Sequence, residues 1–376
     1  MKLKFSIKSI GNFFAVVSLK TPGYAVAVVK NGKTVLMKTA GLADLDKKIP
    51  ITTKTAFRLA SLSKQFTAMA VMILAERKKL NLENKLTDFL PNYPAYGKKV
   101  TVRQLLTHTA GIPDHEKPIY KSLRATERSA AISANAPRND ERHSEATIYE
   151  ALKILKSQAT PLFFPGSRYL YSDAGYVLLA LIIEKVSGLS YREFFKQNIF
   201  SPLSMSGSDV LDKTKPKIKN RAIGYKISDL YYTGRGRCQD NRDDNNGITS
   251  KFEVFDYDPL NYIVGDEGVY SSLDDMIKWN LAWDEEKLVS RKSLAAAMEP
   301  AKLTGGKFGK AGFSWLLRKF NGDKIIYQDG VWVGFRNIIL KIPEQKLTVV
   351  ILSNRTDLDT KRQRVSIVYS VAQKFI

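Results

Sequence analysis

The chain has 376 residues, of which 44% are hydrophobic and 10% aromatic, a composition typical of a folded globular protein. Its 59 Lys and Arg residues outnumber its 37 Asp and Glu residues, which gives a formal net charge of +22. The single cysteine, Cys238, excludes an internal disulfide framework and a zinc site built on several thiolates, and no apolar run approaches the ~18 residues of a membrane span.

The first predicted elements are a helix and a hairpin. Apolar residues recur at helical spacing over residues 5–19. We interpret this segment as an amphipathic helix and not as a signal sequence, because no small-x-small cleavage site follows it. The β-rich runs of residues 24–39 flank Asn31-Gly32, the dipeptide typical of a tight hairpin.

The middle of the chain is predicted to be mainly helical, with two long loops. Residues 117–146 and 233–252 are polar and are predicted to be these loops. Gly188 is expected to end one of the helices. Helical apolar spacing recurs over residues 64–78, 175–187, 190–199 and 274–284.

β-rich segments at both ends of the chain bracket this helical centre. Residues 335–353 predict a second hairpin, and residues 360–375 predict a closing helix. The simplest arrangement is an α+β fold in which one antiparallel sheet, built from both chain ends, is flanked by helices and interrupted by a mainly helical region. We expect a discontinuous sheet domain of residues 1–80 and 265–376, a helical domain of residues 81–264, and an active site at their interface.

An S-x-x-K pair, Ser61 and Lys64, stands near the start of the apolar run FRLASLSKQFTAMAVMILA at residues 57–75. Residues three apart on a helix share a face, so the Lys64 amine can reach the Ser61 hydroxyl. Burial and the helix N-terminus both favour a neutral lysine, the form that acts as a general base. The pair alone also fits a capping serine with a solvated lysine, because this short motif occurs often by chance.

Further segments add a more specific pattern from residue 21 to residue 354. They are TPGYAVAVV at 21–29, LLTHTAGIP at 105–113, FPGS at 164–167, YSDAGY at 171–176, IIEKVSG at 182–188, GDEGVYSS at 265–272 and GFR at 334–336. Together with the serine–lysine pair, they resemble the serine β-lactamase and penicillin-binding-protein superfamily. The likeness is to class C β-lactamases and to their D-alanyl-D-alanine carboxypeptidase and esterase relatives.

The resemblance implies a β-lactamase-like fold and a serine hydrolase that forms an acyl-enzyme on an amide or ester. Ser61 would be the nucleophile and Lys64 its base. Tyr171 matches the tyrosine of the Y-x-N motif, where a phenol relays a proton and later passes it to the leaving group. Read without the flanking match, Tyr171 could also be a core tyrosine. The resemblance implies no metal and no organic cofactor.

The third motif of the family, K-T-G or H-x-G in relatives, falls on Gln328-Asp329-Gly330. By the resemblance, Gly330 permits close approach of the substrate to an edge strand. The backbone N–H of Val331 is expected to join that of Ser61 as the oxyanion hole.

Two side chains depart from the family pattern. Asp173 stands where asparagine is usual; an ionised aspartate only accepts hydrogen bonds, and it favours a charged Lys64. Gln328 stands where lysine or histidine is usual, which removes a group that helps to bind a substrate carboxylate. Carboxylate-bearing β-lactams and D-Ala-D-Ala peptides are therefore expected to be poor substrates. His108, in the LLTHTAG segment, is expected to be a structural residue of its turn.

The high positive net charge and the two departures from the family pattern each suggest a function other than hydrolysis. The basic residues are spread along the chain and form no zinc-finger, RNP-like or basic-zipper pattern, so we expect a basic surface that favours anionic membranes or envelope polymers and no specific nucleic-acid binding. The main alternative to a hydrolase is a catalytically impaired relative that acts as a binding or scaffold protein. The expected partner of the hydrolase is a small-molecule or peptide amide or ester.

Overall fold

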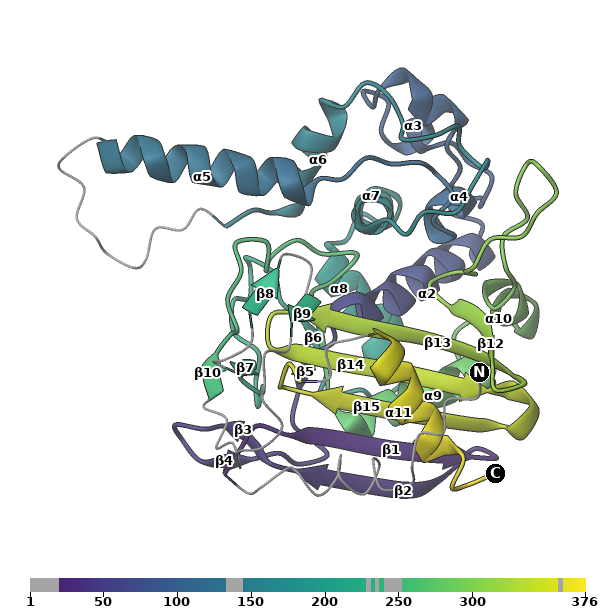
Figure 1. Cartoon of the computed structure of the whole chain (residues 1–376). Coiled ribbons are helices and arrows are strands. Elements are labelled where there is room, and N and C mark those ends of the chain that lie inside the picture. Colours follow the sequence, from purple (N-terminus) through teal and green to yellow (C-terminus); the bar gives the residue numbers. More distant parts are fainter. Residues whose placement is uncertain (1–19, 133–144, 228–230, 234–236, 240–251, 358–360) are drawn as a thin grey trace.

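A computed structural model gives the arrangement of most of the chain (Figure 1). The helix predicted for residues 5–19 lies outside the described part, so that prediction remains a prediction. The structure describes residues 20–132, 145–227, 231–233, 237–239, 252–357 and 361–376.

A six-stranded antiparallel sheet is built from both ends of the chain, which confirms the predicted α+β class (Figure 1). β1 pairs with β15, with Tyr24 opposite Ser353 and Lys30 opposite Leu347. In sheet order the strands are β12 (Leu316–Phe320), β13 (Asp323–Trp332), β14 (Phe335–Ile342), β15 (Leu347–Ser353), β1 (Tyr24–Lys30) and β2 (Lys33–Ala40).

Both predicted hairpins are confirmed. β1 and β2 are joined by Asn31 and Gly32, with φ of 51° and 73°. A two-residue turn with both φ positive matches the right-handed twist of the strands. β14 and β15 are joined by the single 3₁₀ turn η4 (Pro343–Gln345) and by Lys346, whose φ is 45°.

Both faces of the sheet are covered by helices. Val350 of β15 belongs to the large core that includes Trp279 of α9 (Leu273–Asp284). Its neighbour Val349 belongs to a second cluster with α11 (Lys361–Ala372), the helix that crosses the other face in Figure 1. Successive strand residues point to opposite faces, so the central strands read as continuous apolar runs.

The central helices carry the rest of the large core. α2 (Ser63–Glu76) is buried along most of its length, and the Phe66 ring stacks on Trp279 with centroids 3.9 Å apart. α7 (Asp173–Ser187) ends at Gly188, whose left-handed φ of 73° confirms the predicted stop. The other helices are η1 (Ala60–Leu62), α3 (Leu86–Phe89), η2 (Ala95–Lys99), α4 (Val102–Leu106), α6 (Ile148–Lys156), α8 (Tyr191–Phe195), η3 (Lys196–Phe200) and α10 (Arg291–Ala297).

A small three-stranded sheet directly precedes the segment that holds Ser61 and Lys64. It consists of β5 (Phe57–Arg58), β11 (Val269–Ser271) and β6 (Asp209–Val210). The remaining strands form the pairs β3 (Leu42–Asp44) with β4 (Ile49–Pro50), β7 (Tyr225–Ile227) with β10 (Phe252–Val254), and β8 (Tyr231–Thr233) with β9 (Arg237–Gln239).

The prediction of two long loops is partly wrong. α5 (Glu116–Ile132) occupies the first half of the first loop and projects away from the body in Figure 1. The segment is polar but rich in good helix formers, and Pro118 lies in the first turn, where proline is tolerated. In the second predicted loop, the described residues include β9 and begin β10, whereas residues 240–251 lie outside the described part.

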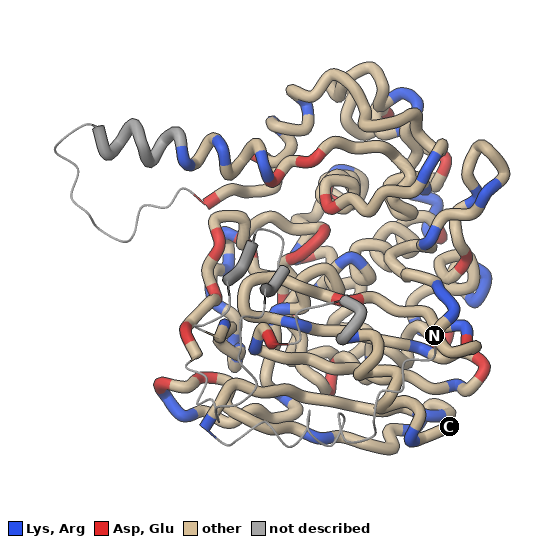
Figure 2. The backbone as a smooth tube through the Cα atoms, viewed as in Figure 1, with Lys and Arg blue, Asp and Glu red and all other residues tan. Residues whose placement is uncertain are grey.

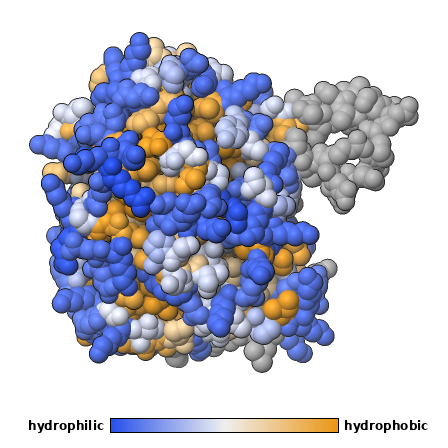
Figure 3. Space-filling view, turned by 180° about the vertical axis from the view of Figure 1, so that it is seen from behind, coloured by the Kyte–Doolittle hydropathy of each residue, from blue (hydrophilic) through white to orange (hydrophobic). Residues whose placement is uncertain are grey.

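Charged residues are spread along the described fold (Figure 2), and apolar side chains form separate groups on one face of it (Figure 3). Lys and Arg are scattered along the fold and do not gather into one stripe (Figure 2). The face seen from behind is mostly hydrophilic, with apolar side chains in separate groups (Figure 3). No single described helix is long and apolar enough to cross a membrane; α7 and Tyr191–Phe200 meet that criterion only together, across a 77° bend.

Candidate active site

Ser61 lies in the short turn η1, between β5 and α2, and its side chain is partly exposed. The segment is held from two sides: the Leu59 N–H donates to Val269 O at 2.8 Å, and Asn337 Nδ2 donates to Arg58 O at 2.8 Å. Ala60 has a φ of 52°, a left-handed conformation that costs energy for a residue with a Cβ. The surrounding contacts thus fix an unfavourable backbone conformation next to an accessible hydroxyl.

Lys64 lies in the first turn of α2 and is fully buried. Its Nζ donates to Ser61 Oγ at 3.0 Å, which confirms that the S-x-x-K spacing brings the two groups together. The same Nζ donates to the backbone oxygen of Asp266 at 3.0 Å and lies 2.7 Å from Asp173 Oδ1. Three oxygen atoms from three separate segments therefore surround one amine.

Two opposing influences from the sequence analysis act on the charge of Lys64. Burial lowers the pKa of Lys64, but the ion pair with Asp173, together with the charge of Asp266, outweighs burial and raises it well above its usual value. Burial likewise raises the pKa of Asp173, while Lys64 and the nearby histidines bring it below its usual value. Asp173 therefore stabilises the ammonium form, as its replacement of asparagine led us to expect, and this effect outweighs the burial that favours a neutral lysine.

Tyr171 lies directly before α7 and is partly exposed. Burial raises the pKa of the Tyr171 phenol to about 12, although Lys64 counters part of this effect. The His108 ring stacks on Tyr171 with centroids 4.4 Å apart, and His108 Nδ1 accepts from the Ser172 N–H at 3.1 Å. Tyr171 is thus a protonated phenol at neutral pH, and His108 packs against it and against the backbone that follows.

Gln328 and Asp329 use their side chains within the protein. Gln328 is buried, and its Nε2 donates to Asp329 O at 3.0 Å and to Ser61 O at 3.4 Å. Asp329 points to the other face of β13 and forms an ion pair with Arg364 of α11 at 2.8 Å. The side chain of Gln328 therefore contacts the backbone of η1 (Ala60–Leu62), the turn that holds Ser61 and is called the serine turn below. Its predicted role in substrate binding stays a prediction.

Gly330 lies at a close approach between β13 and the backbone just before Ser61. A Cβ at this position would lie inside 3.0 Å of the backbone oxygen of Leu59. Because glycine has no Cβ, β13 can approach the turn closely, and Val331 follows as a partly exposed residue next to it.

Two acidic residues beside Lys64 were given no role in the sequence analysis. Burial and neighbouring charges raise the pKa of Asp266 to about 7 and that of Glu267 to about 8. Glu267 Oε2 accepts from Arg58 Nη2 at 3.1 Å. The only signal in the sequence was the GDEG segment, which is unusually acidic for a stretch that proves to be buried.

Comparison with known proteins decides the family. The Beta-lactamase family model matches residues 14–372. The chain belongs to the Beta-lactamase family. Penicillin-binding protein 4* of Bacillus subtilis (strain 168) is 29% identical over 342 residues, which cover 90% of this chain and 69% of that protein. Protein flp of Staphylococcus aureus (strain NCTC 8325 / PS 47) is 28% identical over 345 residues, which cover 89% of this chain and 59% of that protein.

Solved structures agree with this member of the Beta-lactamase family in fold. The octameric penicillin-binding protein homologue from Pyrococcus abyssi is 26% identical, with a TM-score of 0.74 over 99% of this chain and 78% of that one. D-amino acid amidase from Ochrobactrum anthropi SV3 is 20% identical, with a TM-score of 0.72 over 97% of this chain and 96% of that one, and so supports the fold alone. The predicted superfamily and fold are confirmed.

Proposed function

We propose that this protein is a serine hydrolase that cleaves an amide or ester through an acyl-enzyme on Ser61. The observation that carries the proposal is the accessible Ser61 Oγ, which lies 3.0 Å from the Nζ of the buried Lys64 in a chain of the Beta-lactamase family. In the proposed division of the chain, the sheet domain of residues 1–80 and 265–376 supplies this pair, and the helical domain of residues 81–264 supplies Tyr171.

The proposed reaction has two steps. The Ser61 O–H bond breaks as Oγ attacks the substrate carbonyl carbon, and the neutral form of Lys64 takes the proton. The backbone N–H groups of Ser61 and Val331 stabilise the oxyanion. As the bond to the leaving group breaks, Tyr171 passes it a proton that Lys64 replaces. Water then attacks the acyl-Ser61 carbonyl, the bond between the acyl carbon and Ser61 Oγ breaks, one proton of the water returns to Oγ through Lys64, and the acid is released.

Replacing Asp173 with asparagine is expected to move the rising limb of the pH–kcat/KM profile to lower pH. Lys64 accepts a proton only when neutral, and its raised pKa makes that form scarce at pH 7 and commoner as the pH rises. Asp173→Asn removes the carboxylate and so lowers this pKa. Because the rate follows the deprotonated fraction of the base, activity at pH 7 should rise by roughly tenfold. A complete pH profile of both proteins measures the shift.

Asp284→Asn is the matched control for this change. Asp284 Oδ1 also pairs with a buried lysine, Lys341, at 2.7 Å, but on α9 and β14, away from the serine turn. Its pH profile should coincide with that of the unaltered protein. A limb that moves to higher pH in Asp173→Asn, or that moves equally in both variants, would contradict the role given to Lys64.

The substrate class is proposed to be small-molecule or peptide amides and esters that lack a carboxylate next to the cleaved bond. The residue expected to bind such a carboxylate is Gln328, which has no charge and whose amide contacts backbone oxygens. Similarity to a protein named as penicillin-binding makes penicillin a necessary probe.

Covalent labelling tests the proposal directly. The unaltered protein is exposed in turn to a fluorophosphonate, an activated p-nitrophenyl ester and a penicillin, and its intact mass is measured. We expect an adduct with the first two reagents, little or none with penicillin, and peptide mapping that assigns the adduct to Ser61. A folded protein that forms no adduct with any reagent would overturn the proposal and favour the binding or scaffold protein.

A further inference from the structure

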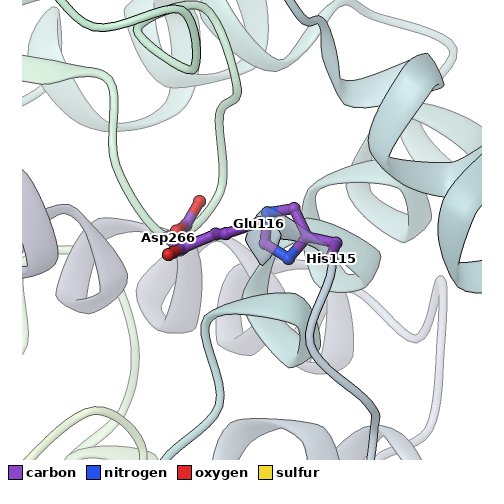
Figure 4. Close-up of side chains that lie close together, drawn as sticks. All are labelled: His115, Glu116 and Asp266. Atoms are coloured by element: carbon purple, nitrogen blue, oxygen red, sulfur yellow. The ribbon is translucent and has the colours of Figure 1, made fainter. Parts of the chain in front are cut away.

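A small pocket beside Lys64 gathers side chains from distant parts of the chain. His115 and Glu116 lie at the start of α5, and Asp266 lies in the segment before β11. Figure 4 shows the three side chains pointing toward one another. The pocket is completed by Leu260, Ile263, Glu267 and Trp332.

The donor atoms in this pocket are close together and partly unpartnered. One ligand atom from each of His115, Glu116 and Asp266 lies within 4.8 Å of the others. His115 is 1% exposed and Asp266 3% exposed, yet His115 Nδ1 and Asp266 Oδ1 have no hydrogen-bond partner among the described residues. Because a buried polar atom without a partner is costly, an unpartnered carboxylate oxygen of Asp266 and an unpartnered imidazole nitrogen of His115, on two side chains that line one pocket, point to a missing ligand.

The charge of the pocket gives the sign of that ligand. Three carboxylates line it, and Arg58 pairs with Glu267. Among the described residues, Glu116 and Asp266 form no ion pair. A bound cation would offset the mutual repulsion of these carboxylates and would give the unpartnered carboxylate oxygen of Asp266 a partner.

We propose that His115, Glu116 and Asp266 bind one Zn²⁺ or Mn²⁺ ion. One imidazole nitrogen with two carboxylate oxygens is a donor set for these ions, whereas Ca²⁺ and Mg²⁺ prefer sites made of oxygen alone. Three protein ligands leave further coordination positions for water. The site goes beyond the proposed acyl transfer, in which Ser61 and Lys64 act without a metal.

Calorimetric titration of the chelator-treated full chain tests the site. We expect one Zn²⁺ or Mn²⁺ per chain, much weaker binding of Mg²⁺, and a higher Tm with the bound ion. His115→Gln and Asp266→Asn should each weaken binding by about tenfold or more, because each removes one of three ligands. Asp284→Asn and Glu286→Gln are the controls for losing one carboxylate outside the pocket, where these residues pair with Lys341 and Arg291, and both should bind the ion as the unaltered protein does.

The absence of binding, or equal affinity in His115→Gln and the unaltered protein, would overturn the site. If the two pocket variants fail to fold, Co²⁺ in the unaltered protein still decides the question. We expect visible d–d absorption bands without a thiolate charge-transfer band in the near ultraviolet. A thiolate band would assign the ion to Cys238 and overturn the proposal, as would the absence of any Co²⁺ spectrum.

Discussion

Ser61→Ala is expected to abolish the covalent adduct and to lower turnover of an activated ester by about 10⁴-fold or more. Removing the nucleophile of a serine hydrolase eliminates the acyl-enzyme route and leaves only binding and electrostatic effects. The Ser61 Oγ accepts a hydrogen bond from Lys64, so the substitution removes one buried partner of Lys64 while Asp173 and the Asp266 carbonyl remain. Initial rates with a p-nitrophenyl ester and intact mass after fluorophosphonate treatment measure the two effects.

Ser63→Ala is the matched control, because Ser63 lies two residues away on the same segment. Its Oγ accepts from the Val269 N–H at 3.1 Å. Losing this buried hydrogen bond should cost about 1 kcal/mol of stability but should leave the adduct intact. Ester turnover by Ser61→Ala within tenfold of the unaltered rate, with Ser63→Ala equally affected, would show that Ser61 is not the nucleophile.

The features predicted best from the sequence are those that depend only on residues close together in the chain. Ser61 and Lys64 are three residues apart, so their contact follows from local geometry, and Asn31-Gly32 determines its own turn. The helix α5 was not predicted, because its polar composition hides a short apolar face in which Ile119 lies in the large core and Leu123 packs against it.

What the sequence could not supply is the contact between distant charges. Burial and the helix N-terminus predicted a neutral Lys64 and Asp173 a charged one, and the sequence alone could not decide between them because the distance between Lys64 and Asp173 is determined by the packing of two separate helices. His115 showed no pattern of its own, and only the fold places it opposite Asp266. The spacing of apolar residues along the chain predicts the helices and strands. The protonation states of the buried side chains depend instead on which helices and strands pack together in the core.

Gly330→Ala is expected to destabilise the protein by about 3 kcal/mol and to lower acylation of Ser61 at least about 100-fold. A Cβ would meet the backbone oxygen of Leu59, and neither backbone segment can yield as a flexible side chain would. Overpacking of this kind commonly costs one to three kcal/mol. β13 and the serine turn must therefore separate, and a displacement of about 1 Å is enough to lose much of a rate that depends on positioning.

Gly305→Ala separates this clash from the general effect of replacing a glycine. A Cβ at Gly305 would meet nothing within 4 Å, so its Tm and its labelling rate should stay close to those of the unaltered protein. Gly330→Ala should instead show a Tm lower by about 5 °C, together with slow labelling by the fluorophosphonate. If the two variants behaved alike, the close approach of β13 to Leu59 would not be what positions Ser61, and the proposed oxyanion role of the adjacent Val331 would lose its structural basis.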